Sequence, residues 1–227
     1  FRHELDVNYK ANRPETPPPL IKQLRATADL IPRLGMPALQ QDGFEADDLI
    51  ATAARQAQGC GWRVEIFSGD KDLAQLVGEQ VVLLGQEKKT GEFITTGIDG
   101  VREKWGVPPG KLADLFALVG DASDNVPGVK GIGPKGAAKL IETWGSLDAI
   151  YENLDRVEPK GMREKLAAER DHAFLSKRLV TLDAVPAALP PVEELVLKPV
   201  KQGEVLELLR SWELATTIRR FAFDRPA

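Results

Sequence analysis

Carboxylate side chains gather in three short segments whose composition and spacing could hold metal ions. The segments are Glu45-Ala-Asp47-Asp48, Asp70-Lys-Asp72 and Asp121-Ala-Ser-Asp124. Taken alone, each segment could simply cap a helix, since acidic side chains are common at helix starts. Together, seven carboxylates in one place would repel one another and raise each other's pKa unless cations lay among them. Hard oxygen ligands of this kind favour Mg²⁺ or Mn²⁺ over zinc.

Two divalent ions held about 4 Å apart by such a cluster would support hydrolysis of a phosphodiester, by activating a water molecule and stabilising the leaving oxygen. Asp70 and Asp72 follow a predicted strand, and sites in parallel α/β sheets lie beyond the carboxyl ends of strands. Glu45 and Asp48 are three residues apart and share a helix face, so Asp47 would reach a common ion only from an irregular first turn. The pattern predicts a metal-dependent phosphodiesterase site.

Residues 126–141, VPGVKGIGPKGAAKLI, predict a glycine turn that leads into a helix. Gly131 and Gly133 make the turn, and Pro134 is a favourable first helical residue. Backbone N–H groups at this helix start can face a phosphate directly. The lysines of the segment are Lys130, Lys135 and Lys139. We interpret the segment as a helix–hairpin–helix that binds the duplex backbone without reading bases; the alternative is a plain turn with solvated lysines.

The first 19 residues are polar, basic and rich in proline, which predicts an arm or loop. Basic side chains mixed with an aromatic ring suit a single nucleic-acid strand, because charges follow the phosphates and rings stack on bases. The residues concerned are Arg2, Tyr9, Lys10 and Arg13. By themselves, these residues are more typical of a solvated face than of a binding site.

Composition narrows the class of protein. The 227 residues are 43% apolar and 28% charged, which is ordinary for a globular protein and excludes a wholly disordered chain. The single Cys60 cannot form an intramolecular disulfide, which fits a reducing compartment. No apolar run approaches the roughly 20 residues of a membrane helix. The net charge of −4 argues against a simple basic DNA binder. If the seven acids of the predicted metal site are left out, 27 of the 34 Asp and Glu residues remain against 30 Lys and Arg residues. The rest of the surface is then mildly positive, as binding to a polyanion requires.

The elements that must position these residues form two lobes. Residues 44–61, 62–67, 72–77 and 81–84 predict the order helix, strand, helix, strand, and residues 88–95 predict a hairpin turn. This order indicates an α/β lobe with parallel strands over residues 1–116. Residues 117–227 predict a mainly helical lobe with helices at 134–145, 146–154 and 159–182, a strand at 194–199 and a helix at 203–214. We expect the two lobes to pack together.

Five segments in order, residues 1–14, 44–51, 67–76, 118–140 and 143–154, resemble the 5′-nuclease domain of bacterial DNA polymerase I and its flap-endonuclease relatives. The resemblance implies a PIN-like α/β lobe with a helical arch and a helix–hairpin–helix lobe of SAM-like fold. It implies metal-dependent cleavage at 5′ ends and 5′ flaps of branched DNA, and often of primer RNA, in replication and repair. It also implies a bacterial, cytoplasmic, nucleoid-associated monomer that is fused to a DNA polymerase or works beside one.

The resemblance assigns roles by position. All seven clustered acids match the family's metal site, Lys10 matches the arch lysine that contacts the scissile phosphate, and Arg13 matches a neighbouring basic residue of the arch. The turn at Gly131 and Gly133 matches the duplex-binding hairpin, which in relatives also holds a monovalent cation such as K⁺.

The chain departs from the family pattern at its start. The pattern begins with a strand that bears a Gly-Asp metal ligand, and a second strand ends in Asp just before the FRHE segment; neither precedes Phe1 here. We therefore expect either additional sequence upstream or a catalytically impaired DNA-binding remnant. Two further alternatives are a PIN-type ribonuclease, against which the hairpin argues, and a helical scaffold with acidic caps.

Overall fold

The computed structural model describes residues 1–87, 90–182 and 189–221. The chain divides into two compact units. The larger unit comprises Phe1–Arg13 and Gln41–Ala188, and the smaller comprises Pro14–Gln40 and Leu189–Ala227.

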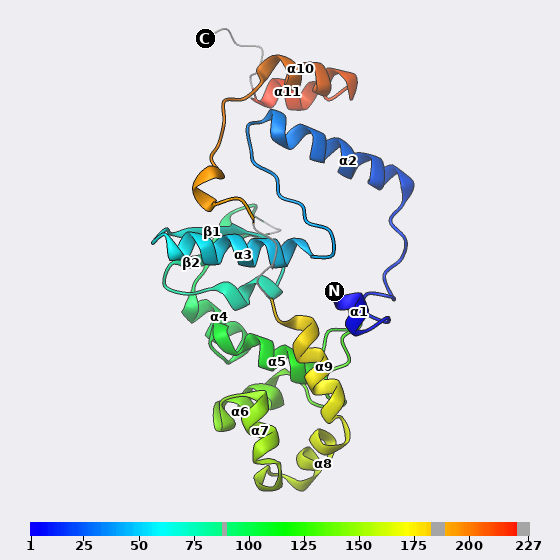
Figure 1. The fold of residues 1–227 in the computed structure, drawn as a ribbon, viewed down its shortest axis with the longest axis vertical. Coiled ribbons are helices and arrows are strands. Elements are labelled where there is room, and N and C mark those ends of the chain that lie inside the picture. Colours follow the sequence, from blue (N-terminus) through cyan, green and yellow to red (C-terminus); the bar gives the residue numbers. More distant parts are fainter. Residues whose placement is uncertain (88–89, 183–188, 222–227) are drawn as a thin grey trace. The chain divides into compact units, whose positions relative to one another are not determined.

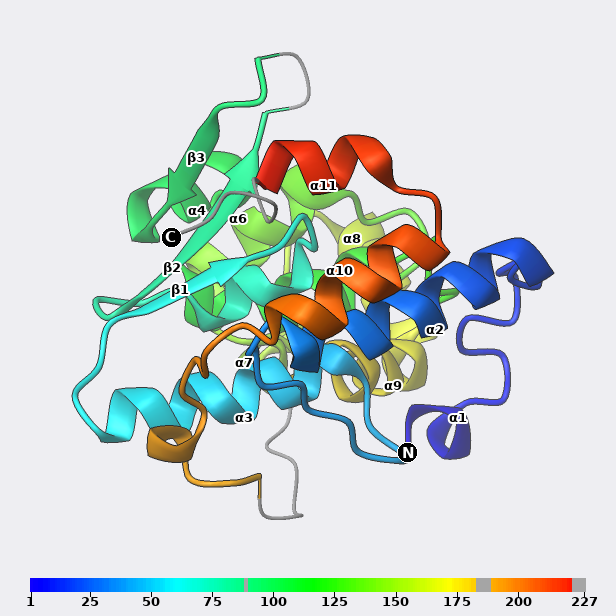
Figure 2. The ribbon, with the colours of Figure 1, turned by 90° about the horizontal axis from the view of Figure 1, so that it is seen from above.

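A mixed three-stranded sheet lies in the larger unit (Figures 1 and 2). Strand β1 (Val64–Phe67) pairs in parallel with β2 (Val81–Gln86), and β2 pairs antiparallel with β3 (Phe93–Thr96). Helix α3 (Ala46–Gly59) precedes β1 and packs against it, and the short 3₁₀ helix η1 (Asp72–Leu76) follows β1. The predicted order helix, strand, helix, strand is confirmed; the third strand is antiparallel because the six residues between β2 and β3 are too few for the crossover that a parallel pair needs. Residues 88–89 of the predicted hairpin turn lie outside the described residues.

The rest of the larger unit is helical. Its helices are α1 (Arg2–Leu5), α4 (Ile98–Trp105), α5 (Leu112–Val119), α6 (Pro134–Trp144), α7 (Leu147–Glu152), α8 (Lys160–Ala168) and α9 (Arg170–Val180), with 3₁₀ helices η2 (Pro109–Lys111) and η3 (Leu154–Arg156). Helix α5 is apolar on nearly every side, and Leu112, Leu115 and Leu118 are buried. It packs against α6, α7 and α9, which is why this short helix stands at the centre of the helical part.

One continuous hydrophobic core joins the sheet to these helices. It includes Ile66 and Leu83 from the strands, Leu73 from η1, and Ile150 and Leu166 from the helical part. The carboxyl end of β1 and the loop after α5 are therefore held on one rigid body, and both carry predicted metal ligands.

The smaller unit contains α2 (Pro18–Arg33), η4 (Val192–Glu194), α10 (Gln202–Ser211) and α11 (Ala215–Phe221). Leu30 and Leu34 pack against a small core of Val205, Leu209 and Ile218. The predicted helix at 203–214 is confirmed as α10, and α2 ends one residue after Pro32, which cannot continue a helix for long.

The predicted strand at 194–199 is wrong. Residues 195–201, all within the described chain, form no strand. The backbone N–H of Lys198 donates instead to the Gly35 carbonyl at 2.8 Å, and Lys201 N donates to Arg33 O at 2.9 Å. The apolar run lacks a strand partner, and a strand needs one to satisfy its backbone. None of the described helices is long and apolar enough to cross a membrane.

Candidate metal centre

The carboxylates at the start of α3 lie in different environments because successive residues point to different sides of the helix. Glu45 is the N-cap, and its backbone N–H donates to Asp48 Oδ2 at 3.2 Å in a capping box. Asp48 thus turns inward and is completely buried, whereas Asp47 lies on the partly exposed side of the first turn. The cap interpretation therefore holds for Glu45 and Asp48, whereas Glu45 and Asp47 both remain partly exposed.

Arg2 fixes Asp48 in the interior. Nη1 and Nη2 of Arg2 donate to the two Asp48 oxygens at 2.5 and 2.8 Å, and Nε donates to the Leu179 carbonyl at 2.7 Å. Arg2 is only 4% exposed. The sequence predicted Asp48 as a metal ligand and Arg2 as a DNA contact; the structure instead places the two side chains together in the core, with their hydrogen-bonding groups turned to the protein.

Three carboxylates from two loops converge beside a surface pocket of about 290 Å³. Oxygen atoms of Asp72, Asp121 and Asp124 all lie within 4.8 Å of one another. Asp72 begins η1 directly after β1, and its backbone N–H donates to Asp70 Oδ1 at 3.0 Å. The two predicted clusters therefore meet near the carboxyl end of β1, where sites in parallel α/β sheets lie.

Two glycines, Gly120 and Gly128, let the two ends of the loop that carries Asp121 and Asp124 come close together. Asp121 and Val126 form a backbone bridge, with N–O distances of 2.9 and 2.7 Å. Gly120 and Gly128 have φ of 75° and 63°, and a Cβ on Gly128 would lie 2.4 Å from the Gly120 backbone nitrogen. Only glycine allows the two ends of this loop to approach so closely.

Lys71 neutralises one carboxylate of the cluster. Its Nζ lies 2.8 Å from Asp121 Oδ2, and Ser123 also donates to Asp121 through its backbone N–H at 2.8 Å. Burial alone would raise the pKa of Asp121, but the hydrogen bonds from Lys71 and Ser123 outweigh it and lower that pKa. Sequence reasoning missed Lys71, although its position between Asp70 and Asp72 indicated that it would lie near the acids.

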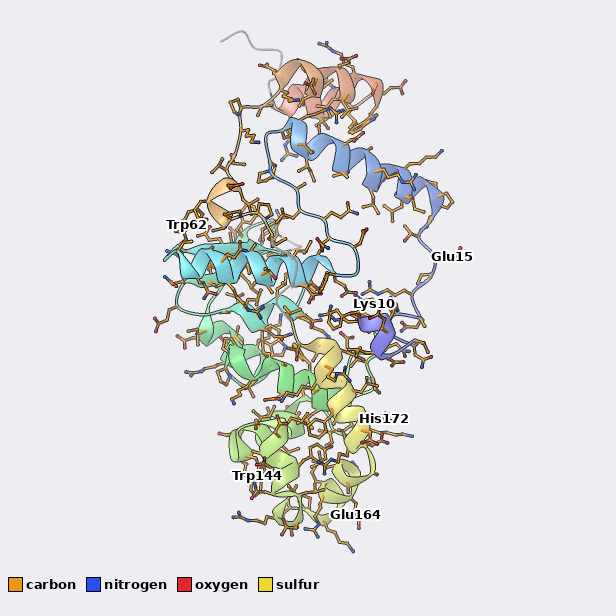
Figure 3. All side chains as sticks on the ribbon, viewed as in Figure 1. Lys10, Glu15, Trp62, Trp144, Glu164 and His172 are labelled. Carbon is orange, nitrogen blue, oxygen red and sulfur yellow. The ribbon has the colours of Figure 1, made fainter. Side chains whose placement is uncertain are left out.

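Lys10 and Arg13 pair with two other carboxylates of the cluster, Glu45 and Asp124. Lys10 Nζ lies 2.5 Å from Glu45 Oε1 and 3.5 Å from Asp124 Oδ2, and Arg13 forms an ion pair with Asp124. Figure 3 labels Lys10 just after α1. Tyr9 is 4% exposed and its hydroxyl donates to Glu45 Oε2 at 3.1 Å, so the ring predicted to stack on a base lies inside the protein.

Backbone contacts hold the segment 8–13 onto the Asp121–Asn125 loop. Lys10 N donates to Asp124 O at 2.9 Å, and the side-chain amides of Asn125 and Asn12 donate to Asn8 O and Ala122 O, each at 2.7 Å. These asparagines were not predicted as site residues. They place the basic side chains of the segment over the acids.

The acids remain in surplus over the cations. Apart from Asp48, six carboxylates face three cations; the acids are Glu45, Asp47, Asp70, Asp72, Asp121 and Asp124, and the cations are Lys10, Arg13 and Lys71. Burial, followed by the charges of Asp70 and Glu45, raises the pKa of Asp47 to about 6. Burial, followed by the charge of Asp70, raises the pKa of Asp72 to about 7. The surplus of negative charge and these all-oxygen side chains fit a hard divalent cation.

The glycine hairpin lies between α5 and α6. Gly131 has φ of +82°, Gly133 is the N-cap of α6, and Pro134 is its first residue, as predicted. Lys130, Lys135 and Lys139 are exposed. A residue that was not predicted also reaches the turn: Nζ of Lys165, on α8, donates to the Gly131 carbonyl at 3.0 Å.

Comparison with known proteins agrees with this architecture. Residues 1–106 match the family model of the 5′-3′ exonuclease N-terminal resolvase-like domain, and residues 107–203 match that of the 5′-3′ exonuclease C-terminal SAM fold. DNA polymerase I of Rhizobium leguminosarum is 43% identical over 223 residues, which are 98% of this chain and 22% of the polymerase. The chain thus spans about a fifth of that relative's length.

Solved structures share the fold. A bacteriophage T5 protein co-crystallised with metal ions superposes with a TM-score of 0.69 at 25% identity, over 80% of this chain and 71% of the T5 chain. The T5 flap endonuclease in a pseudo-enzyme-product complex with DNA and metal ions gives 0.69 at 23% identity, over 92% and 79%.

The PIN-like and SAM-like halves, the converging acids and the matches over both halves lead to one conclusion: the chain belongs to the 5′-3′ exonuclease family.

Proposed function

We propose that this chain is a structure-specific 5′ nuclease, which hydrolyses phosphodiesters at 5′ ends and 5′ flaps of DNA in replication and repair. The convergence of Asp72, Asp121 and Asp124 within 4.8 Å beside three basic side chains carries the proposal. We assign the nuclease role to residues 1–116 and duplex binding to residues 117–227.

The metal in the proposal is Mg²⁺ or Mn²⁺, and two or more ions. The ligands we assign are Glu45, Asp47, Asp70, Asp72, Asp121 and Asp124; Asp48 instead positions the start of α3 by holding Arg2. When bound, such ions lower the pKa of water and offset charge on a phosphodiester. The side chains contribute a pocket where two carboxyl groups, Asp47 and Asp72, are readily protonated in the absence of metal.

Lys10 and Arg13 have two roles in the proposal. Without metal they neutralise Glu45 and Asp124. Glu45 and Asp124 would hold the divalent cations, and Lys10 and Arg13 would then be available to contact the scissile phosphate. Arg13 is suited to this exchange because its side chain is 54% exposed.

The substrate in the proposal is branched or flapped duplex DNA, and also an RNA primer on DNA. The exposed lysines of the hairpin and the backbone N–H groups at the start of α6 suit a phosphate backbone. We further propose that the protein acts as a monomer, together with a fused or separate DNA polymerase, at the bacterial nucleoid. The resemblance also implies K⁺ at the hairpin, where Lys165 already donates to the Gly131 carbonyl.

The test is cleavage of a labelled 5′-flap duplex in Mg²⁺, with the 227-residue chain and with the complete protein encoded by its gene. The double variant Asp70→Ala, Asp121→Ala is expected to lose at least a hundredfold in rate. A control that also removes two negative charges, Glu79→Ala with Glu152→Ala, changes exposed residues and should retain activity.

Unchanged cleavage by the Asp70, Asp121 variant would refute the site assignment. Binding of the flap duplex that weakens steeply with salt, without product at any Mg²⁺ or Mn²⁺ concentration, would establish a DNA-binding protein without catalysis. Equal cleavage of free single-stranded RNA and flap DNA would favour a PIN-type ribonuclease.

A further inference from the structure

Three carbonyls of the hairpin already have donors within the protein. Lys165 Nζ donates to Gly131 O at 3.0 Å, Ile132 N donates to Val129 O at 3.1 Å, and Ala137 N donates to Gly133 O at 3.0 Å. Two of these donors are backbone groups of the hairpin and α6. The third is a charged side chain from a helix 34 residues further along the chain.

Packing of α8 puts Lys165 at this place. Leu166 is fully buried, and its carbonyl accepts from the Tyr151 hydroxyl at 3.1 Å. One turn earlier, Met162 lies against α6, with its Cε 3.5 Å from the position of a Cβ on Gly136. Lys165 is three residues after Met162 and so projects on a neighbouring part of the same helix face. Figure 3 labels Glu164, the preceding residue on α8, and Trp144 at the end of α6.

The tip of the Lys165 side chain lies in the space that glycine leaves open at position 131. A Cβ on Gly131 would lie 2.9 Å from Lys165 Nζ and 3.2 Å from its Cε. The lysine side chain therefore lies across the side of Gly131 where another residue would carry its own side chain. Gly131 thus supplies both the positive φ of the turn and the space for the ammonium group.

The Lys165 side chain lies at the surface. It is exposed, and among the residues that the structure describes it forms no ion pair with a carboxylate. The adjacent Glu164 pairs with Lys160, whose Nζ lies 3.5 Å from Glu164 Oε1. Lys165 thus adds a fourth ammonium group to the hairpin region, beside those of Lys130, Lys135 and Lys139.

A free K⁺ does not fit beside this arrangement. The Lys165 ammonium already occupies the Gly131 carbonyl at 3.0 Å, so an ion on that carbonyl would have to displace it or lie beside it against charge repulsion. We propose that Lys165 is a tethered cation, which supplies the positive charge at the hairpin turn and binds the backbone phosphate of duplex DNA there. The inference rests on the proposed duplex binding by the hairpin.

The experiment measures affinity for a 5′-flap duplex by fluorescence anisotropy at one ionic strength in KCl, NaCl or N-methyl-D-glucamine chloride. The wild-type chain should bind equally in all three salts. Lys165→Met should weaken binding roughly tenfold, reduce the salt slope by about 1, and regain part of the affinity in KCl. Lys160→Met removes an exposed lysine from the same helix and should change affinity less than twofold.

The outcomes separate the two proposals. Binding by the wild-type chain that is several-fold tighter in KCl than in the other salts would mean a free cation at the hairpin, and would overturn the tethered-cation proposal. So would unchanged binding by a folded Lys165→Met variant while a Lys135→Ala, Lys139→Ala variant binds weakly. If the double variant also binds normally, the hairpin does not contact DNA and the proposed duplex-binding role fails as well. Thermal unfolding of each variant establishes that it is folded.

Discussion

Arg2 and Asp48 form a buried ion pair with two N–O contacts, at 2.5 and 2.8 Å, which joins α1 to the first turn of α3. The neighbouring Asp47 has no such partner among the described residues, and its pKa is raised to about 6, mainly by burial. Two adjacent acids of one sequence motif therefore serve different purposes. Asp48 stabilises the fold, and we assign Asp47 to the metal site.

Substitution of these two acids should affect stability very differently. Asp48→Asn leaves the Arg2 charge buried without a counter-charge and should lower the free energy of unfolding by about 3–5 kcal/mol. Asp47→Asn removes a carboxylate that burial disfavours and should leave stability unchanged or slightly higher at pH 8. Urea denaturation in EDTA measures both; an equal loss in the two variants would contradict the division of roles.

The pKa of Asp72 predicts how metal-free stability depends on pH. Its folded-state pKa of about 7 exceeds the unfolded value of about 3.9, so the folded state favours the neutral acid. Its contribution to stability is full below the unfolded pKa and is lost as the pH rises through about 7. Asp72→Asn should therefore raise the free energy of unfolding at pH 8 by about 1–2 kcal/mol, less than the pKa difference implies because the side chain is partly exposed. If the variant is no more stable than wild type in EDTA at pH 8, the raised pKa is wrong.

Mg²⁺ binding should be coupled to proton release near neutral pH. Asp47 and Asp72 must ionise before they can act as ligands, and the pKa of each is raised. The apparent affinity should rise roughly twentyfold between pH 6 and pH 8, since over that interval the ionised fraction rises about tenfold for Asp72 and about twofold for Asp47. Calorimetry in two buffers of different ionisation enthalpy measures the protons released. Binding that is independent of pH and buffer would exclude these two groups as ligands.

Gly120 and Gly128 should be essential to the shape of the loop that carries Asp121 and Asp124. A Cβ at Gly128 would meet the Gly120 backbone at 2.4 Å in a residue whose φ is already +63°. Gly128→Ala should lower the midpoint of thermal unfolding by several degrees and weaken Mg²⁺ binding, because Asp121 and Asp124 move with the loop. Gly133→Ala is the matched control, since a Cβ there has no neighbour within 4 Å. Similar melting temperatures for the two variants would show that the loop tolerates the change.

Local sequence patterns were enough to predict much of this protein. Periodic apolar residues predicted α3 and α10, β-branched runs predicted β1 and β2, and Pro134 after two glycines predicted the start of α6. These features depend on residues close together in the chain. The strand predicted at 194–199 was wrong because a strand depends on a distant partner, and the sequence pattern did not reveal its absence.

The roles of individual charged residues depended on contacts between distant segments. The sequence identified seven acids as one set, but only the tertiary structure buried Asp48 against Arg2 and brought Asp72 beside Asp121 and Asp124. It likewise paired Lys71 with Asp121, and placed Lys165 over Gly131, 34 residues away in the chain. The sequence determined which chemical groups are available. Burial and proximity determine their pKa and their partners, and both arise only when remote segments pack against each other.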